Sequence, residues 1–221
     1  MIKKKHIPVL LKESIDSLNI NPDLFYIDGT LGDGGHSLEI LNKLSEEGLL
    51  ISIDQDINAI NFVKSYYPED IHRKNWIIKQ SNFRNIKSIC QDIKRNPSGI
   101  LLDLGLSSRQ LEDSHQRGFS YLEEEEPLDM RMNIDLGVTA KDLLNALSEK
   151  ELTFLFRKYG EERFSSQIAR EIKKCITNIN TVGDLTRLIY RIVPANQSKK
   201  NPSRRVFQAL RIVVNDELNS L

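Results

Sequence analysis

The sequence has 221 residues, enough for one large domain or two small ones. Its 31 lysines and arginines balance 31 aspartates and glutamates, so any surface that attracts nucleic acid must be local. Because no apolar run approaches the length of a membrane span and the N-terminus lacks the apolar core of a signal peptide, we expect a cytoplasmic protein without a membrane partner. Cys90 and Cys175 lack metal-ligand spacing, and no metal site is predicted.

A helix over residues 8–18 precedes a predicted strand, glycine turn and helix in residues 25–44. The turn, with its glycines at 29, 32, 34 and 35, lets a ligand approach bare backbone near the positive end of a helix, where N–H groups lack partners. Its G-x-x-G-x-G-G spacing differs from the dinucleotide fingerprint and argues against a pyrophosphate. A nucleoside-type cofactor remains, although the glycines could simply form a tight turn.

Three further predicted strands cover residues 49–53, 76–78 and 99–104 and alternate with helices. This alternation predicts an α/β fold whose parallel strands gather ligands at their carboxyl ends. Asp54 follows the second strand as a candidate ribose ligand, or as the cap of the next helix. Phe83 follows the third strand, where its ring could cover an adenine or pack under its own helix. Asp103 interrupts the apolar fourth strand, which we expect to be central and buried on both faces.

From residue 105 the strand pattern ends and, after a polar loop and an acidic run at 123–126, only helices are predicted. We therefore predict a sheet domain over 1–108, an inserted helical domain over 109–200 and a return to the sheet domain over 201–221. A basic segment around residue 201 could bind phosphate or be a solvated linker; it comprises Lys199, Lys200, Arg204 and Arg205.

Seven motifs, in this order, resemble those of the MraW/RsmH family of S-adenosylmethionine-dependent methyltransferases, which act on N4 of a cytidine in small-subunit ribosomal RNA. They run nearly from end to end of the chain: HIPVLLKE at 6–13, DGTLGDGGHS at 28–37, DLGLSSRQL at 103–111, RGFSY at 117–121, PLDMRM at 127–132, GEERFS at 160–165 and FQALRI at 207–212.

The resemblance implies a Rossmann-like class I methyltransferase sheet with an inserted all-helical domain, and small-subunit ribosomal RNA or the assembled small subunit as partner. It also implies that S-adenosylmethionine contacts seven residues: Gly34, Gly35, His36, Asp54, Phe83, Asp103 and Gln110. The target cytidine must be unstacked and held, for which four residues are candidates that could equally be structural: Arg117, Phe119, Tyr121 and Arg131. No residue is assigned to orient the target amine.

Members of this family continue past the final helix into further strands, so we expect a sheet incomplete at its C-terminal strands. The expected strand order 3-2-1-4 leaves the fourth strand without a neighbour on one side, which predicts self-association through an exposed edge. One alternative is a non-catalytic RNA-binding or assembly protein. Another is a small-molecule methyltransferase, which the helical insertion disfavours.

Overall fold

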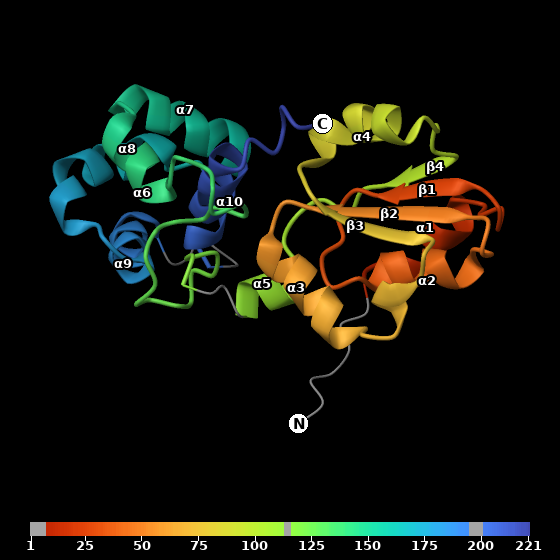
Figure 1. The fold of residues 1–221 in the computed structure, drawn as a ribbon. Helices are drawn as coiled ribbons and strands as arrows, with labels where there is room; N and C mark the ends of the chain where they lie inside the picture. The colour runs from red at the N-terminus through yellow and green to blue at the C-terminus, as the bar shows by residue number, and fades with distance from the viewer. Residues whose placement is uncertain (1–7, 113–115, 195–200) are drawn as a thin grey trace. The chain divides into compact units, whose positions relative to one another are not determined.

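The computed structural model describes residues 8–112, 116–194 and 201–221 (Figure 1). It divides the chain into two compact units, one of residues 1–108 with 220–221 and one of residues 109–219. None of the described helices combines the length and the apolar character that crossing a lipid bilayer requires.

The first unit is built on four parallel strands in the order β3-β2-β1-β4. Their bounds are Phe25–Asp28 for β1, Leu49–Asp54 for β2, Trp76–Gln80 for β3 and Gly99–Leu101 for β4. The predicted α/β fold class and the predicted 3-2-1-4 order are confirmed. Because all strands run the same way, their carboxyl ends share one edge of the sheet.

Helices cover both faces of this sheet, α4 on one side and α2 and α3 on the other (Figure 1). The bounds are Leu11–Ser17 for α1, Gly35–Lys43 for α2, Ile57–Tyr66 for α3 and Ile86–Ile93 for α4. Side chains alternate along the strands, so Tyr26 packs in the cluster that includes Leu38 and Val63, while Ile27 packs in the cluster that includes Ile89. The strands are therefore buried between two apolar layers.

The fourth strand departs from the prediction. It ends at Leu101 and pairs only with β1, and the Ile100 side chain is 44% exposed and that of Leu102 38%. The expectation of a central strand buried on both faces is wrong, because the apolar run at 99–104 lies at an edge of the described sheet. Asp103 follows the strand, outside the core.

The second unit is helical. After α5 at Ser108–Glu112, its helices are α6 at Ala140–Ala146, α7 at Glu149–Gly160, α8 at Ser165–Lys174, α9 at Val182–Ile192 and α10 at Ser203–Val214. Capping boxes start α6, α7 and α9, through the pairs Thr139 with Asp142, Ser148 with Glu151 and Thr181 with Asp184.

Residues 201–219 belong to this helical unit, so the structure differs from the predicted boundary after residue 200 and from the predicted return of the last helix to the sheet. Helix α10 packs on α6, α7 and α9. Gly160, at the end of α7, allows the close approach, because a Cβ there would lie 2.3 Å from the carbonyl oxygen of Arg205. The apolar stripe of residues 206–214 indicated an amphipathic helix but did not identify its packing partner.

Candidate functional site

The glycine turn after β1 is tied to the neighbouring strands by its own amides. The N–H of Gly29 donates to the carbonyl of Leu101 at 2.9 Å, and the N–H of Gly32 donates to Oδ2 of Asp54, also at 2.9 Å. The amides of Gly29 and Gly32 are thus used within the protein, whereas no side chain caps the start of α2, where unpaired N–H groups were expected. These bonds fix the turn against β2 and β4.

Asp54, at the end of β2, is the carboxylate that accepts this hydrogen bond from the glycine turn. Its Oδ1 accepts the N–H of Asp56 at 2.9 Å, while Asp56, not Asp54, caps α3 by accepting the N–H of Asn58. Burial raises the pKa of Asp54 to about 6, against the lowering effect of the two backbone N–H groups. Each oxygen keeps a further lone pair for a ligand hydroxyl.

Gly34 and Gly35 open α2, where space is too restricted for larger side chains. Gly34 has a φ of +83°, and a Cβ there would lie 3.2 Å from the side chains of Val63 and Tyr67. A Cβ on Gly35 would lie 2.6 Å from Pro8. Packing therefore requires Gly35, and the left-handed backbone requires Gly34.

His36 and Asp103 meet at the same edge of the sheet. His36 Nδ1 lies 3.8 Å from Oδ2 of Asp103, whose side chain is 57% exposed. The imidazole is 5% exposed, and its Nε2 has no hydrogen-bonding partner among the described residues. A buried polar atom without a partner is costly, which makes Nε2 a natural contact for a polar ligand group.

Phe83 lies in a short 3-10 helix after β3 and is partly buried. A Cβ on Gly29 would lie 3.3 Å from the Cβ of Phe83, so the aromatic residue sits directly against the glycine turn. Six of the seven residues predicted to bind the cofactor thus gather around the carboxyl ends of the strands. The seventh, Gln110, lies in α5 at the start of the helical unit, and its contact with the cofactor stays a prediction.

Asp28 and its neighbours form a buried polar group that sequence reasoning missed. The Asp28 carboxylate is fully buried; its Oδ2 accepts the hydroxyl of Ser37 at 2.6 Å and its Oδ1 accepts the N–H of Thr30 at 3.0 Å. Burial raises the pKa of Asp28, and these two hydrogen bonds oppose the rise. Thr30 Oγ1 also accepts the N–H of Asp103 at 2.7 Å. The aspartate before a glycine turn was a visible signal, but nothing in the sequence distinguished buried hydroxyls from exposed ones.

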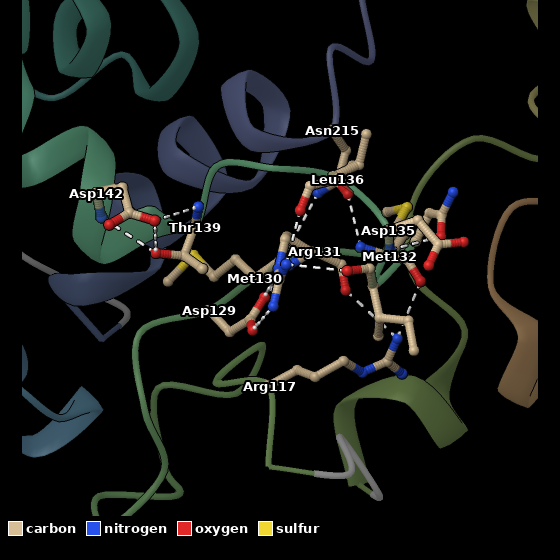
Figure 2. A network of polar contacts seen from close by, with 12 residues as sticks. Arg117, Asp129, Met130, Arg131, Met132, Asp135, Leu136, Thr139, Asp142 and Asn215 are labelled. Atoms are coloured by element: carbon tan, nitrogen blue, oxygen red, sulfur yellow. Dashed lines mark hydrogen bonds and ion pairs between the residues drawn. The ribbon is translucent and has the colours of Figure 1, made fainter.

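In the helical unit, a polar network surrounds Arg131 (Figure 2). Its Nε and Nη2 donate to the two carboxylate oxygens of Asp129, both at 2.7 Å, and its Nη1 donates to the carbonyls of Ile134 and Leu136. The guanidinium lowers the pKa of Asp129 against the opposing effect of burial. Most donors of Arg131 are therefore used within the protein, and a role in RNA binding stays a prediction.

Arg117 and Phe119 are 4% and 5% exposed, and the Arg117 guanidinium lies over the Phe119 ring at 4.8 Å. Figure 2 shows Arg117 below the segment around Arg131, and its Nη1 donates to the carbonyl of Met132 at 3.1 Å. This burial favours the structural role for both side chains, and their contact with RNA stays a prediction. Tyr121 packs edge-on against Phe207 but stays partly exposed, and it remains a candidate.

The basic segment is only partly described. Lys199 and Lys200 lie outside the described residues, whereas Arg204 and Arg205 are exposed in the first turn of α10. The acidic run at 123–126, by contrast, is more than solvated surface. Glu124 pairs with Arg187 at 2.8 Å, and the Glu126 carboxylate accepts the N–H of Gly118 at 2.8 Å. The run therefore helps to shape the helical unit.

Within the described ranges, no cluster of three or more histidine, cysteine, aspartate or glutamate side chains could hold a metal ion. The chemistry of the sheet edge is that of two carboxylates, an imidazole, an aromatic ring and a glycine turn. Such a set suits a nucleoside ligand with ribose hydroxyls and a charged polar end.

Comparison with known proteins relates the chain to a family of methylases. The chain matches the model of the MraW methylase family over residues 3–221. It is 48% identical to ribosomal RNA small subunit methyltransferase H of Clostridium botulinum strain Loch Maree and 47% identical to that of strain Kyoto, over 98% of this chain and 70% of each relative. A crystal structure attributed to an rRNA methylase of Clostridium thermocellum aligns with 38% of this chain and 46% of its own, at 16% identity and a TM-score of 0.34, which is too low to support an argument. The match over nearly the whole chain shows that it belongs to the MraW methylase family.

Proposed function

We propose that this protein transfers a methyl group from S-adenosylmethionine to N4 of a cytidine in small-subunit ribosomal RNA. Membership of the family and the names of the relatives support a methyltransferase acting on ribosomal RNA of the small subunit. The observation that carries the proposal is the hydrogen bond from the glycine turn to Asp54, beside Phe83 and Asp103 at the carboxyl ends of parallel strands.

The residues at this edge fit the proposed cofactor. Asp54 has lone pairs for the ribose hydroxyls, Phe83 offers a ring for the adenine, and the buried Nε2 of His36 requires a polar partner. Gly34 and Gly35 keep side chains away from the backbone at the start of α2. When bound, S-adenosylmethionine supplies a methyl group already activated by its sulfonium.

The exocyclic amine of cytidine is a weak nucleophile, so alignment contributes much of the rate. The chain must hold the amine in line with the methyl group and accept the proton that nitrogen loses after the new bond forms. Asp103 carries an exposed carboxylate at this edge, and main-chain carbonyls follow it in the loop after β4. These oxygens are the acceptors that the fold offers to the amine hydrogens.

The proposal extends to the partner and the compartment. The small ribosomal subunit, or its RNA, is the proposed substrate, and a cytoplasmic location follows from that substrate. The helical unit is the proposed RNA-binding part, with Tyr121, Arg131, Arg204 and Arg205 as the partly or fully exposed candidates.

The test has two stages. Calorimetry measures S-adenosylmethionine binding, and transfer of a labelled methyl group to small ribosomal subunits is then followed by mass spectrometry of the modified nucleoside. Asp54→Ala should lose cofactor affinity, whereas Ser65→Ala, an exposed serine on α3, serves as the matched control. Methylation at cytidine N4 supports the proposal. RNA binding without cofactor binding would instead support a non-catalytic assembly protein.

A further inference from the structure

Four buried residues form a chain of hydrogen bonds across the first unit. The indole Nε1 of Trp76 on β3 donates to Oγ of Ser52 on β2 at 2.8 Å. Ser52 Oγ lies 2.7 Å from Oγ of Ser37 on α2, which donates to Oδ2 of Asp28 at the end of β1 at 2.6 Å. All four side chains are at most 5% exposed. This chain of hydrogen bonds connects β3, β2 and α2 to the carboxylate at the end of β1.

This chain of bonds has only one satisfactory direction. An indole N–H can only donate, so Ser52 must accept from Trp76 and has a single hydrogen left to give to Ser37. Ser37 then gives its hydrogen to Asp28. If Asp28 were protonated at Oδ2 and donated in reverse, the Ser52 hydrogen would lose its acceptor in a fully buried place. Oδ1 also accepts, from the N–H of Thr30 at 3.0 Å, so both carboxylate oxygens act as acceptors, which favours an ionised Asp28.

Thr30 connects the Asp28 carboxylate to the main chain of Asp103 at the sheet edge. Its N–H donates to Oδ1 of Asp28 at 3.0 Å, and its Oγ1 accepts the N–H of Asp103 at 2.7 Å. Burial disfavours the ionised form of Asp28 most, and Asp103 disfavours it further. The hydrogen bonds from Ser37 and Thr30, together with the nearby His36, favour the ionised form. Asp28 thus holds Thr30, and Thr30 holds the main chain at Asp103.

We propose that Asp28 is a positioning residue, kept as an anion by the one-way chain from Trp76 and fixing, through Thr30, the backbone of Asp103. The proposal rests on the proposed function only in that Asp103 is taken to face the methyl donor or the target amine. Asp28 itself touches neither and acts through the residues that it orients.

The first test uses the ligand-free protein. Trp76 is the only tryptophan of the chain, so its indole N–H gives a single NMR signal. We expect this signal to move in Ser52→Ala and also in Ser37→Ala, and to stay in place in Ser65→Ala. In Ser37→Ala, hydrogen exchange at the Asp103 amide should accelerate, because Asp28 loses the hydroxyl that helps to hold it in place. An unchanged Asp103 amide in a folded Ser37→Ala would overturn the proposal.

The charge and the last link are tested separately. Infrared difference spectra of wild type and Asp28→Asn at pH 7 should show the loss of a carboxylate band; loss of a protonated carboxyl band would overturn the proposal. If Asp28→Asn does not fold, Thr30→Val, which keeps the shape and removes the hydroxyl, tests the link to Asp103. Its Asp103 amide should exchange about tenfold faster, and Thr30→Ser should restore protection.

Cofactor titration then distinguishes this proposal from the proposed function. If wild type binds S-adenosylmethionine, Thr30→Val should bind it several-fold more weakly and Thr30→Ser should recover, in step with the amide protection. If wild type does not bind it, the proposed function fails while the ligand-free measurements still decide the role of Asp28. If binding is normal in wild type and in a Thr30→Val protein whose Asp103 amide exchanges as in wild type, only the positioning role fails.

Discussion

Replacing Asp54 by asparagine separates cofactor binding from stability. Because burial raises its pKa from 3.8 to about 6, ionised Asp54 costs the folded state about 3 kcal/mol at neutral pH. Asparagine avoids this cost, but its amide NH₂ must face the N–H of Gly32 or Asp56, which leaves a buried donor unpaired at a cost of about 1–3 kcal/mol. The two effects nearly cancel, so the free energy of unfolding should change by no more than about 2 kcal/mol.

Asp54→Asn should, by contrast, weaken cofactor binding. The ribose hydroxyls lose charge-assisted bonds of about 1–3 kcal/mol in total, which corresponds to binding weaker by about 5- to 150-fold. RNA affinity should change little, because the proposed RNA-binding residues lie in the helical unit.

The pH dependence gives an independent signature. The raised pKa means that the folded state holds the Asp54 proton more tightly than the unfolded state, so this group contributes stability below about pH 4 that is lost as pH rises towards 6. Cofactor binding to the ionised form runs the opposite way, and affinity should fall as pH drops below about 6. Asp54→Asn should lack both trends.

Calorimetry of S-adenosylmethionine binding and urea unfolding, each at several values between pH 4 and 7, measure both trends in wild type and variant. Comparing the two proteins cancels the titration of all other groups. An Asp54→Asn variant with wild-type affinity, or a wild-type affinity that is flat from pH 7 to 5, would refute the reasoning.

Three further outcomes are expected. Gly34→Ala should lower the free energy of unfolding, measured in urea, by about 1–3 kcal/mol, because φ is +83° and two side chains lie close. Gly137→Ala is the control, because a Cβ there meets open space, and it should leave the free energy of unfolding unchanged. Equal values for the two variants would contradict this expectation. The β4 edge should support self-association that Ile100→Lys reduces, so sedimentation showing a concentration-independent monomer for wild type would remove this expectation. Alanine at Arg204 and Arg205 should weaken RNA binding and flatten its salt dependence by about 1.4–1.8 in log–log slope, whereas an unchanged slope would show that neither contacts phosphate.

Much of the sheet unit could be predicted, because its signals are local. Apolar runs that alternate with helical periods predicted parallel strands, and the residues that follow those strands placed Asp54, Phe83 and Asp103 at one edge. Capping chemistry is equally local, because the box formed by Ser148 and Glu151 at the start of α7 follows from their three-residue spacing.

What could not be predicted depends on contacts between distant segments. The apolar stripe of α10 fits a sheet as well as a helix bundle, and only the close approach at Gly160 shows which one it covers. Arg117 and Phe119 resembled RNA ligands because a cation beside a ring looks the same in sequence whether it is buried or exposed. The hydroxyl chain to Asp28 joins residues up to 48 positions apart, and no spacing rule identifies it.

The capping boxes of the helical unit imply that acid treats the two units differently. Hydrogen bonds to the helix starts lower the pKa of Asp142, Glu151 and Asp184, so the stability that they contribute is present above their unfolded pKa values and is lost as pH falls below about 4. Asp54 in the sheet unit responds in the opposite sense. Mild acid should therefore loosen the helix starts first, and limited digestion by an acid protease should cut within residues 139–184 while the strands remain intact.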